Sequence, residues 1–98
     1  MRAVVADIAT LIGCDPGAVA LMPNTTTGVA TVANGLGLVD GDRIVGLEGE
    51  YPANVYPWRR LERFGVRYLQ LQARGERFDY KEIEEALASP TRVLAVSF

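Results

Sequence analysis

The segment AVALMPNTTTGVATVANGL, residues 18–36, joins a short apolar run to a helical stretch through a turn that contains three threonines. Its first five residues, 18–22, form a continuous apolar run between Gly17 and Pro23. Such a run is typical of a strand that is buried on both faces. A helix is expected from about residue 26 to residue 36. A buried strand that leads directly into a helix favours an α/β fold.

The same alternation of helix and strand extends outward from this segment. Helices are expected over residues 2–12 and 55–64 and within 78–87, and strands over residues 43–47, 66–71 and 92–98. Strands separated by helices imply right-handed crossover connections. We therefore expect a three-layer α/β/α architecture, in which helices cover both faces of a mostly parallel sheet.

Polar residues mark the starts of the later helices. Asn54 is expected to cap the helix over residues 55–64, because asparagine is a preferred N-cap residue. Asp79 and Glu82 have the spacing of a capping box at the start of the last helix. Ile83 and Leu87 lie on one side of that helix and are expected to form its buried stripe.

Composition limits the class of protein. A chain of 98 residues, 49% of them hydrophobic, forms one domain at most. The formal net charge of -2 argues against a nucleic-acid partner. No apolar run reaches the roughly 20 residues that span a bilayer, and the N-terminus lacks the pattern of a secretory signal. We therefore expect a cytoplasmic protein with no membrane partner.

Two residue types that often carry chemistry are scarce. Histidine is absent, which excludes Ser-His and Cys-His catalytic pairs and removes the commonest transition-metal ligand. Cys14 is the only cysteine, so an internal disulfide and a multi-cysteine zinc site are excluded. No metal site is expected.

The threonine-rich turn is a candidate site for an anion. A loop that leaves a parallel strand and enters a helix presents unpaired N–H groups and the positive end of the helix dipole, and threonine hydroxyls add donors. The alternative interpretation is that one threonine caps the helix and the others are surface residues. Neither a Walker motif nor the fingerprint GxGxxG is present in this turn, so hydroxyls and amides would hold a phosphate.

Tyr51 follows the predicted strand over residues 43–47 and would lie on the same rim as the threonine turn. The carboxyl ends of parallel strands share one edge of a sheet, where ligands gather. A flat ring at this place could stack on a flat cofactor ring. Tyr56 and Trp58 are expected instead to pack the loop onto the following helix.

Five motifs in fixed order resemble one known family. They are NTTTGVATVANGL (24–36), GDRIVGLEGEYPANVYPW (41–58), GVRYLQL (65–71), FDYKEIEEAL (78–87) and TRVLAVSF (91–98). Together they resemble the class V aminotransferases, enzymes dependent on pyridoxal 5′-phosphate. This family includes cysteine desulfurases, isopenicillin N epimerase-like proteins and various transaminases.

The resemblance implies roles for individual residues. In this family the loop matching Asn24, Thr25 and Thr26 contacts the phosphate of the cofactor. The family's E-H-H-A-N stretch, whose first histidine stacks on the pyridine ring, matches residues 50–54, with Tyr51 in place of that histidine. Tyrosine can stack but cannot supply the imidazole that assists proton transfer in desulfurases. The resemblance therefore favours a transaminase or an epimerase-like enzyme that acts on an amino acid.

The resemblance covers the N-terminal part of the family's large domain, so residues 1–98 are expected to be a partial domain. The family needs a Schiff-base lysine and an acidic partner for the pyridine nitrogen. Lys81 is the only lysine and lies on the polar side of its helix. Both groups are therefore expected beyond residue 98, and the chain alone is expected to be inactive. The family is usually homodimeric, and its sheet places the strand matching residues 18–22 at one edge, apart from the other three strands.

Two other interpretations stay open at this point. A small non-catalytic α/β module, flavodoxin-like in architecture, could use the same threonine loop for the phosphate of a flavin or a nucleotide. An interaction or RNA-binding protein could use the arginines within residues 59–77. Glu62 and Glu76 lie among those arginines, which is more typical of a solvated surface.

Overall fold

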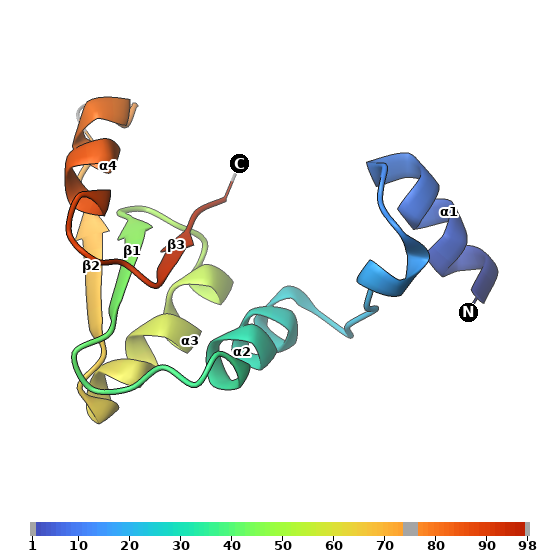
Figure 1. Ribbon diagram of the computed structural model, residues 1–98, viewed down its shortest axis with the longest axis horizontal. Coiled ribbons are helices and arrows are strands. Elements are labelled where there is room, and N and C mark those ends of the chain that lie inside the picture. The colour runs from blue at the N-terminus through green and yellow to red at the C-terminus, as the bar shows by residue number, and fades with distance from the viewer. Residues whose placement is uncertain (1, 74–76, 98) are drawn as a thin grey trace.

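Three parallel strands form the centre of the structure, a computed structural model that describes residues 2–73 and 77–97. The strands are β1 (Arg43–Leu47), β2 (Arg67–Leu71) and β3 (Val93–Ala95), in the spatial order β2-β1-β3 (Figure 1). The helices are α1 (Arg2–Ile12), α2 (Thr25–Gly35), α3 (Tyr56–Arg59) and α4 (Tyr80–Leu87). Shorter 3-10 helices are η1 (Pro16–Ala18), η2 (Pro52–Asn54) and η3 (Arg60–Phe64). The expected α/β fold with a parallel sheet is confirmed.

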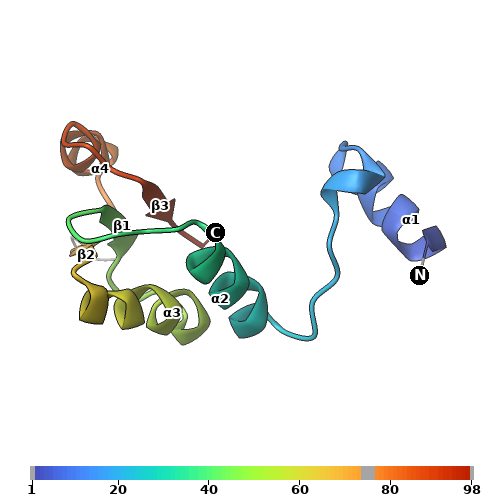
Figure 2. The ribbon, with the colours of Figure 1, turned by 60° about the horizontal axis from the view of Figure 1, so that its bottom comes forward.

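Helices lie on both faces of the sheet. In Figure 2, α2 and α3 lie below the strands and α4 lies above them. Ile44 of β1 packs with Ala33 and Trp58 in the core on the side of α2 and α3. Leu47 points to the opposite face of the same strand and lines a cavity with Ile83 of α4. Covering both faces explains why β1 is a continuous apolar run.

The expected helix over residues 55–64 forms in two parts. The α-helical turn of α3 tightens into η3, and Gly65 ends the segment with a φ of 84°. This left-handed conformation favours glycine, which explains the stop signal at this position. Trp58 and Leu61 on this segment are buried against the sheet, which holds it in place.

The strand expected over residues 18–22 is wrong. Residues 16–18 form η1, and residues 19–22 have no regular secondary structure. Leu21 and Met22 are 41% and 44% exposed. An apolar run becomes a strand only where a neighbouring strand accepts its hydrogen bonds, and within the described residues the sheet contains only β2, β1 and β3. Residues 19–22 instead connect α1 and η1, which stand apart in Figures 1 and 2, to the rest of the structure.

The cap expected at Asn54 is also wrong. Asn54 is the last residue of η2, and Val55, which precedes α3, makes no capping side-chain hydrogen bond. The side-chain amide of Asn54 is bonded instead to Glu50 and Trp58. Asparagine is a preferred cap, but here the side chain of Asn54 is hydrogen-bonded to Glu50 and Trp58, four residues away on either side, instead of to the start of α3.

The last helix and strand differ from expectation in extent. Asp79 caps α4 by accepting the N–H of Lys81 at 2.9 Å. Ile83 is half-buried and lines a cavity, and Leu87 is 39% exposed, so the stripe of α4 is not enclosed in a core. The strand expected over residues 92–98 is limited to β3, where pairing with β1 extends to Ala95. Residue 98 lies outside the described residues.

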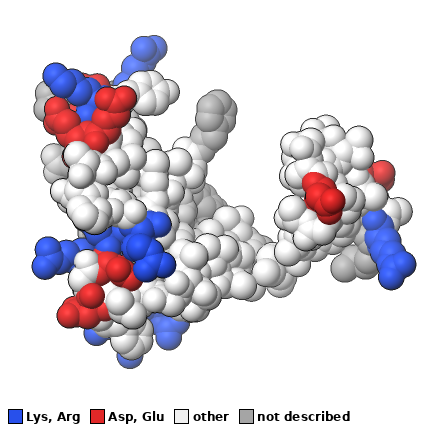
Figure 3. Space-filling view, in the orientation of Figure 1, with Lys and Arg blue, Asp and Glu red and all other residues white. Residues whose placement is uncertain are grey.

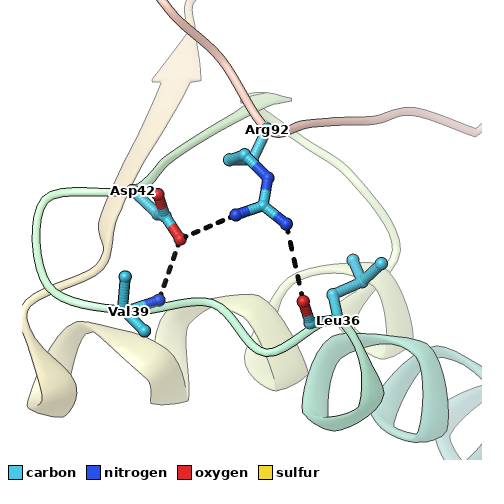
Figure 4. Close-up of polar contacts among 4 residues, drawn as sticks. All are labelled: Leu36, Val39, Asp42 and Arg92. Carbon is cyan, nitrogen blue, oxygen red and sulfur yellow. Dashed lines mark hydrogen bonds and ion pairs between the residues drawn. The ribbon is translucent and has the colours of Figure 1, made fainter.

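Arg92 ties the start of β3 to the turn before β1 (Figure 4). Its Nη1 donates to Oδ2 of Asp42 at 3.2 Å, and its Nη2 lies 3.5 Å from the carbonyl oxygen of Leu36, the C-cap residue of α2. The same carboxylate oxygen of Asp42 accepts the N–H of Val39 at 2.9 Å. These bonds hold the amino end of the sheet, opposite to the rim where ligands were expected.

Candidate functional site

The first turn of α2 is a set of hydrogen-bond donors at a helix N-terminus. Asn24 is extended (φ −163°, ψ 168°), and its Oδ1 accepts the N–H of Thr27 at 2.8 Å. The N–H groups of Thr25 and Thr26 lie in the first turn, where a helix has no internal acceptor for them. The turn contains no acidic residue, so the positive end of the helix dipole is not offset within it. This arrangement can bind an anion.

The alternative in which a threonine caps the helix is wrong, because Asn24 is the N-cap. The hydroxyl of Thr31 donates to the carbonyl oxygen of Thr27 at 2.7 Å, an ordinary contact within the helix. Thr25 and Thr26 are exposed, so their hydroxyls are accessible beside their N–H groups. The helix begins where a phosphate site needs it to begin, while phosphate binding by these residues stays a prediction.

Tyr51 lies directly before η2 and is 72% exposed. The 3-10 helix η2 contacts α2, so the two predicted site segments lie on neighbouring elements. Tyr51 itself is not among the residues that share a cavity with Thr26. Its exposed ring nevertheless offers a flat surface beside the carboxyl end of β1.

Tyr56 is the aromatic residue that lines a cavity with Thr26. This cavity of about 230 Å³ lies between α2 and α3 and is also lined by Arg60. Tyr56 is 65% exposed, so the expectation that it only packs the loop is wrong. The same expectation is confirmed for Trp58, which is 4% exposed. The sequence signal that could have separated the two is the four-residue spacing of Trp58 from Asn54, its hydrogen-bond partner.

Glu50 joins the segment after β1 to the end of β3. Its Oε1 accepts the backbone N–H of Ser97 at 2.7 Å, and its Oε2 accepts the Ser97 hydroxyl. Oε2 also accepts from Nδ2 of Asn54 at 3.3 Å, and Oδ1 of Asn54 accepts Nε1–H of Trp58 at 2.9 Å. We call these four residues the Glu50 network. Sequence analysis gave no role to Glu50 or Ser97, which lie 47 residues apart.

The hydrogen bonds of the Glu50 network set the ionisation of Glu50. Partial burial raises the pKa of its carboxyl. The hydrogen bonds from the hydroxyl and N–H of Ser97 and from the amide of Asn54 lower this pKa, and together the lowering effects are larger than the rise. The net result is a pKa below the ordinary value of 4.5. Glu50 is therefore an ionised acceptor at neutral pH.

A second polar cluster lies beside this network at the carboxyl end of β2. Arg59 donates to Oε1 of Gln70, and its guanidinium carbon lies 5.9 Å from the ring centroid of Tyr68. A cavity of about 210 Å³ is lined by Arg59, Gln70, Tyr56 and Glu50, among others. Polar side chains thus converge on the rim at which β1 and β2 end.

The donors at α2 suit the phosphate of a pyridoxal cofactor. Two N–H groups and two hydroxyls at a helix N-terminus match the acceptor oxygens of a phosphate dianion. Lys81 does not belong to this set, because it is exposed on α4, across the sheet from α2 (Figure 2). In the part of the molecule that contains the sheet, charged side chains of both signs gather over α4 and over the opposite end, with mostly uncharged surface between them (Figure 3).

The described residues contain no cluster of three or more His, Cys, Asp and Glu side chains that could hold a metal ion. None of the helices in this part of the chain is both long and apolar enough to cross a bilayer. The Cys14 thiol is free and exposed in the turn after α1.

Comparisons with known proteins agree with this fold. A family model described as aminotransferase class-V matches residues 1–98. A comparison with curated proteins gives no match. The apo cysteine desulfurase of Thermococcus onnurineus superposes with a TM-score of 0.88 at 21% identity, covering 97% of this chain and 24% of that chain.

Two further solved structures are similar. Cysteine desulfurase CsdA of Escherichia coli has a TM-score of 0.82 at 24% identity, covering 94% of this chain and 25% of its own. LysN, an α-aminoadipate aminotransferase from Thermus thermophilus complexed with N-(5′-phosphopyridoxyl)-L-leucine, has a TM-score of 0.77 at 23% identity, with coverages of 96% and 23%. The chain spans about a quarter of the length of each of these structures.

The fold is that of the pyridoxal-phosphate-dependent transferases, and the donors at the start of α2 suit that cofactor. Within this fold, the chain belongs to the class V aminotransferase family. Pyridoxal 5′-phosphate is the cofactor of this family of enzymes.

Proposed function

We propose that residues 1–98 form the N-terminal part of the large domain of a pyridoxal-phosphate-dependent enzyme, and that the first turn of α2 binds the phosphate of the cofactor. The observation that carries this proposal is the cap of α2. The side-chain oxygen of Asn24 accepts the N–H of Thr27, and the N–H groups of Thr25 and Thr26 remain available. Charge-assisted hydrogen bonds contribute about 1.5–3 kcal/mol each, reduced where solvent competes.

The enzyme acts on an amino acid in the cytoplasm and is a homodimer. When bound, the cofactor supplies an electron sink for the substrate. This chain contributes the phosphate contacts of Thr25 and Thr26 and the ring of Tyr51, which stacks on the cofactor. The lysine that holds the cofactor is not Lys81, whose helix lies across the sheet from α2, so the chain alone binds the cofactor but does not turn over substrate.

The reaction is transamination or epimerisation rather than sulfur removal. Tyr51 stands where the resemblance to desulfurases would require a histidine, and tyrosine does not exchange protons near neutral pH as imidazole does.

Amide NMR of the isotope-labelled chain tests the phosphate site. Pyridoxine 5′-phosphate is the probe, because it carries ring and phosphate but no aldehyde that reacts with amines. We expect it to shift the amides of Thr25 and Thr26, and we expect pyridoxine, which lacks the phosphate, to leave them in place. Thr26→Val should weaken binding, whereas Thr31→Val, which removes a hydroxyl already bonded within α2, should not.

The same titration distinguishes the proposed pyridoxal-phosphate site from the alternative of a flavin-binding module. Flavin mononucleotide carries a comparable phosphate on a different ring system. Tighter binding of flavin mononucleotide than of pyridoxine 5′-phosphate at these amides would favour the non-catalytic module. Unchanged amides of Thr25 and Thr26 with both ligands would contradict any phosphate site at α2.

A further inference from the structure

The Glu50 network closes a loop of backbone around Tyr51. Glu50 lies directly before Tyr51, and Asn54 lies three residues after it at the end of η2. The side chains of Glu50 and Asn54 are bonded to each other, and the carbonyl oxygen of Tyr51 accepts the N–H of Asn54 at 2.8 Å. Both ends of the segment that carries the Tyr51 ring are therefore held by one cluster.

Trp58 fixes the orientation of the Asn54 side-chain amide in this cluster. The indole N–H is a donor only, so the oxygen of the Asn54 amide must face Trp58. Nδ2 of Asn54 must then point the other way, toward Glu50 and toward the Ser97 hydroxyl at 3.5 Å. The backbone N–H of Ser97 adds another donor at the same carboxylate. A carboxylate is the side chain that accepts from all of these donors at once.

We infer that Glu50 is a positioning residue that fixes the Tyr51 segment, residues 51–54, against the end of β3. Its place at the cofactor ring rests on the proposed function, whereas its hold on the segment rests on the hydrogen bonds alone. The ring of Tyr51 is exposed, and Tyr51 makes no capping side-chain bond of its own. The backbone on either side of Tyr51 therefore sets where the ring is attached and which rotamers it can adopt.

The variant Glu50→Gln tests this role. Glutamine presents one oxygen and one NH₂ group to partners that are mainly donors, so either Asn54 or Ser97 loses its acceptor. Glu48→Gln is the matched control, because Glu48 carries the same charge in the same loop and its side chain is exposed. In E50Q, but not in E48Q, we expect backbone order to fall at residues 51–54 and the indole N–H resonance of Trp58 to move.

A ligand-based measurement adds a readout that a general loss of stability would not change. The C6 ring proton and the 2-methyl group of bound pyridoxine 5′-phosphate take a ring-current shift from Tyr51, defined as the difference between the wild-type chain and Tyr51→Ala. We expect E50Q to lose most of this shift while the phosphate-dependent shifts of the Thr25 and Thr26 amides persist.

The two proposals fail in different ways. Absent shifts at Thr25 and Thr26 in the wild-type chain would contradict the phosphate site, and backbone order in the ligand-free chain would still decide the role of Glu50. Backbone order at residues 51–54 that is the same in E50Q and E48Q would overturn the positioning role, whatever the ligand does.

Discussion

The phenol of Tyr68 fills the space above Gly46: a β-carbon at Gly46 would lie 2.8 Å from the Tyr68 hydroxyl oxygen and 3.0 Å from its Cε1. Gly46 lies in β1, where it pairs with Gln70 of β2, so the ring reaches diagonally across two strands. Burial raises the pKa of Tyr68, and the charge of Arg59 beside the ring opposes this rise only in part. A β-carbon at position 46 therefore fits only if the Tyr68 side chain moves.

We expect Gly46→Ala to destabilise the chain by about 1–3 kcal/mol, because the Tyr68 ring must move to admit a methyl group. Urea unfolding followed by circular dichroism measures this difference. Gly35→Ala is the control, because a β-carbon there meets nothing within 4 Å and alanine favours the helix by about 0.5–1 kcal/mol. A G46A chain as stable as the wild type would contradict the packing argument.

Gly65 and Gly37 separate backbone strain from steric overlap. Both have positive φ, 84° and 66°, but a β-carbon at Gly65 would overlap Oδ1 of Asp40, whereas one at Gly37 would meet nothing within 4 Å. Alanine in the left-handed conformation costs about 1–2 kcal/mol at either site. We expect G65A to lose more free energy of unfolding than G37A, and equal losses would argue against the overlap with Asp40.

A double-mutant cycle tests the ion pair at the amino end of the sheet. The side chain of Arg92 is half exposed, so its coupling to Asp42 should be only about 0.2–1 kcal/mol and should weaken as salt is added. Arg92→Ala, Asp42→Asn and the double variant, unfolded at low and high salt, give this coupling energy. Zero coupling energy at low salt would show that the Arg92–Asp42 pair does not contribute to stability.

Glu50 should make stability fall in acid. Its pKa in the folded chain is lowered below 4.5, so its contribution to stability is complete above that value and is lost as the pH falls through the folded-state pKa. Unfolding midpoints of the wild type and E50Q should therefore differ at neutral pH and approach each other as the pH falls through the folded-state pKa of Glu50. E48Q should track the wild type more closely, and a gap between E50Q and wild type that is independent of pH would refute this assignment.

Proline can remove one donor from the phosphate site and keep the helix. Thr25 is the first residue of α2, a position that accepts proline, and the extended backbone of Asn24 is compatible with a following proline. Thr25→Val removes only the hydroxyl, so the difference between T25P and T25V measures the N–H of Thr25. We expect T25P to bind pyridoxine 5′-phosphate about tenfold more weakly than T25V by NMR titration. Equal affinities would place the phosphate elsewhere.

Local signals were sufficient for β1 and α2. The apolar run of β1 is bounded by the turn at residues 40–42, and Asn24 precedes a helical stretch, so neighbouring residues alone set these bounds. Residues 18–22 carry an equally clear strand pattern but remain irregular, because strand pairing depends on chain segments far away in sequence. Apolarity predicts that a segment can be buried, and only a partner makes it a strand.

The site was predictable in part for the same reason. The donors of Thr25 and Thr26 follow from the helix start, which the sequence marks. The bond between Glu50 and Ser97 spans 47 residues and has no local signal. The four-residue steps from Glu50 to Asn54 and from Asn54 to Trp58 were visible, but asparagine before a helix is also a common cap, and this preference led to the wrong assignment.

We expect the irregular connection at residues 19–22 to divide the chain into two units that unfold separately, because α1 contacts η1 whereas the sheet packs with α2 and α3. An isolated helix as short as the 11 residues of α1 is marginal in water, because it lacks a core to pack against. The single tryptophan, Trp58, lies in the other unit, so its fluorescence follows the melting of the sheet and its covering helices. The helical signal in circular dichroism is the sum of both units, so on heating it should begin to decay at a lower temperature than the tryptophan emission changes.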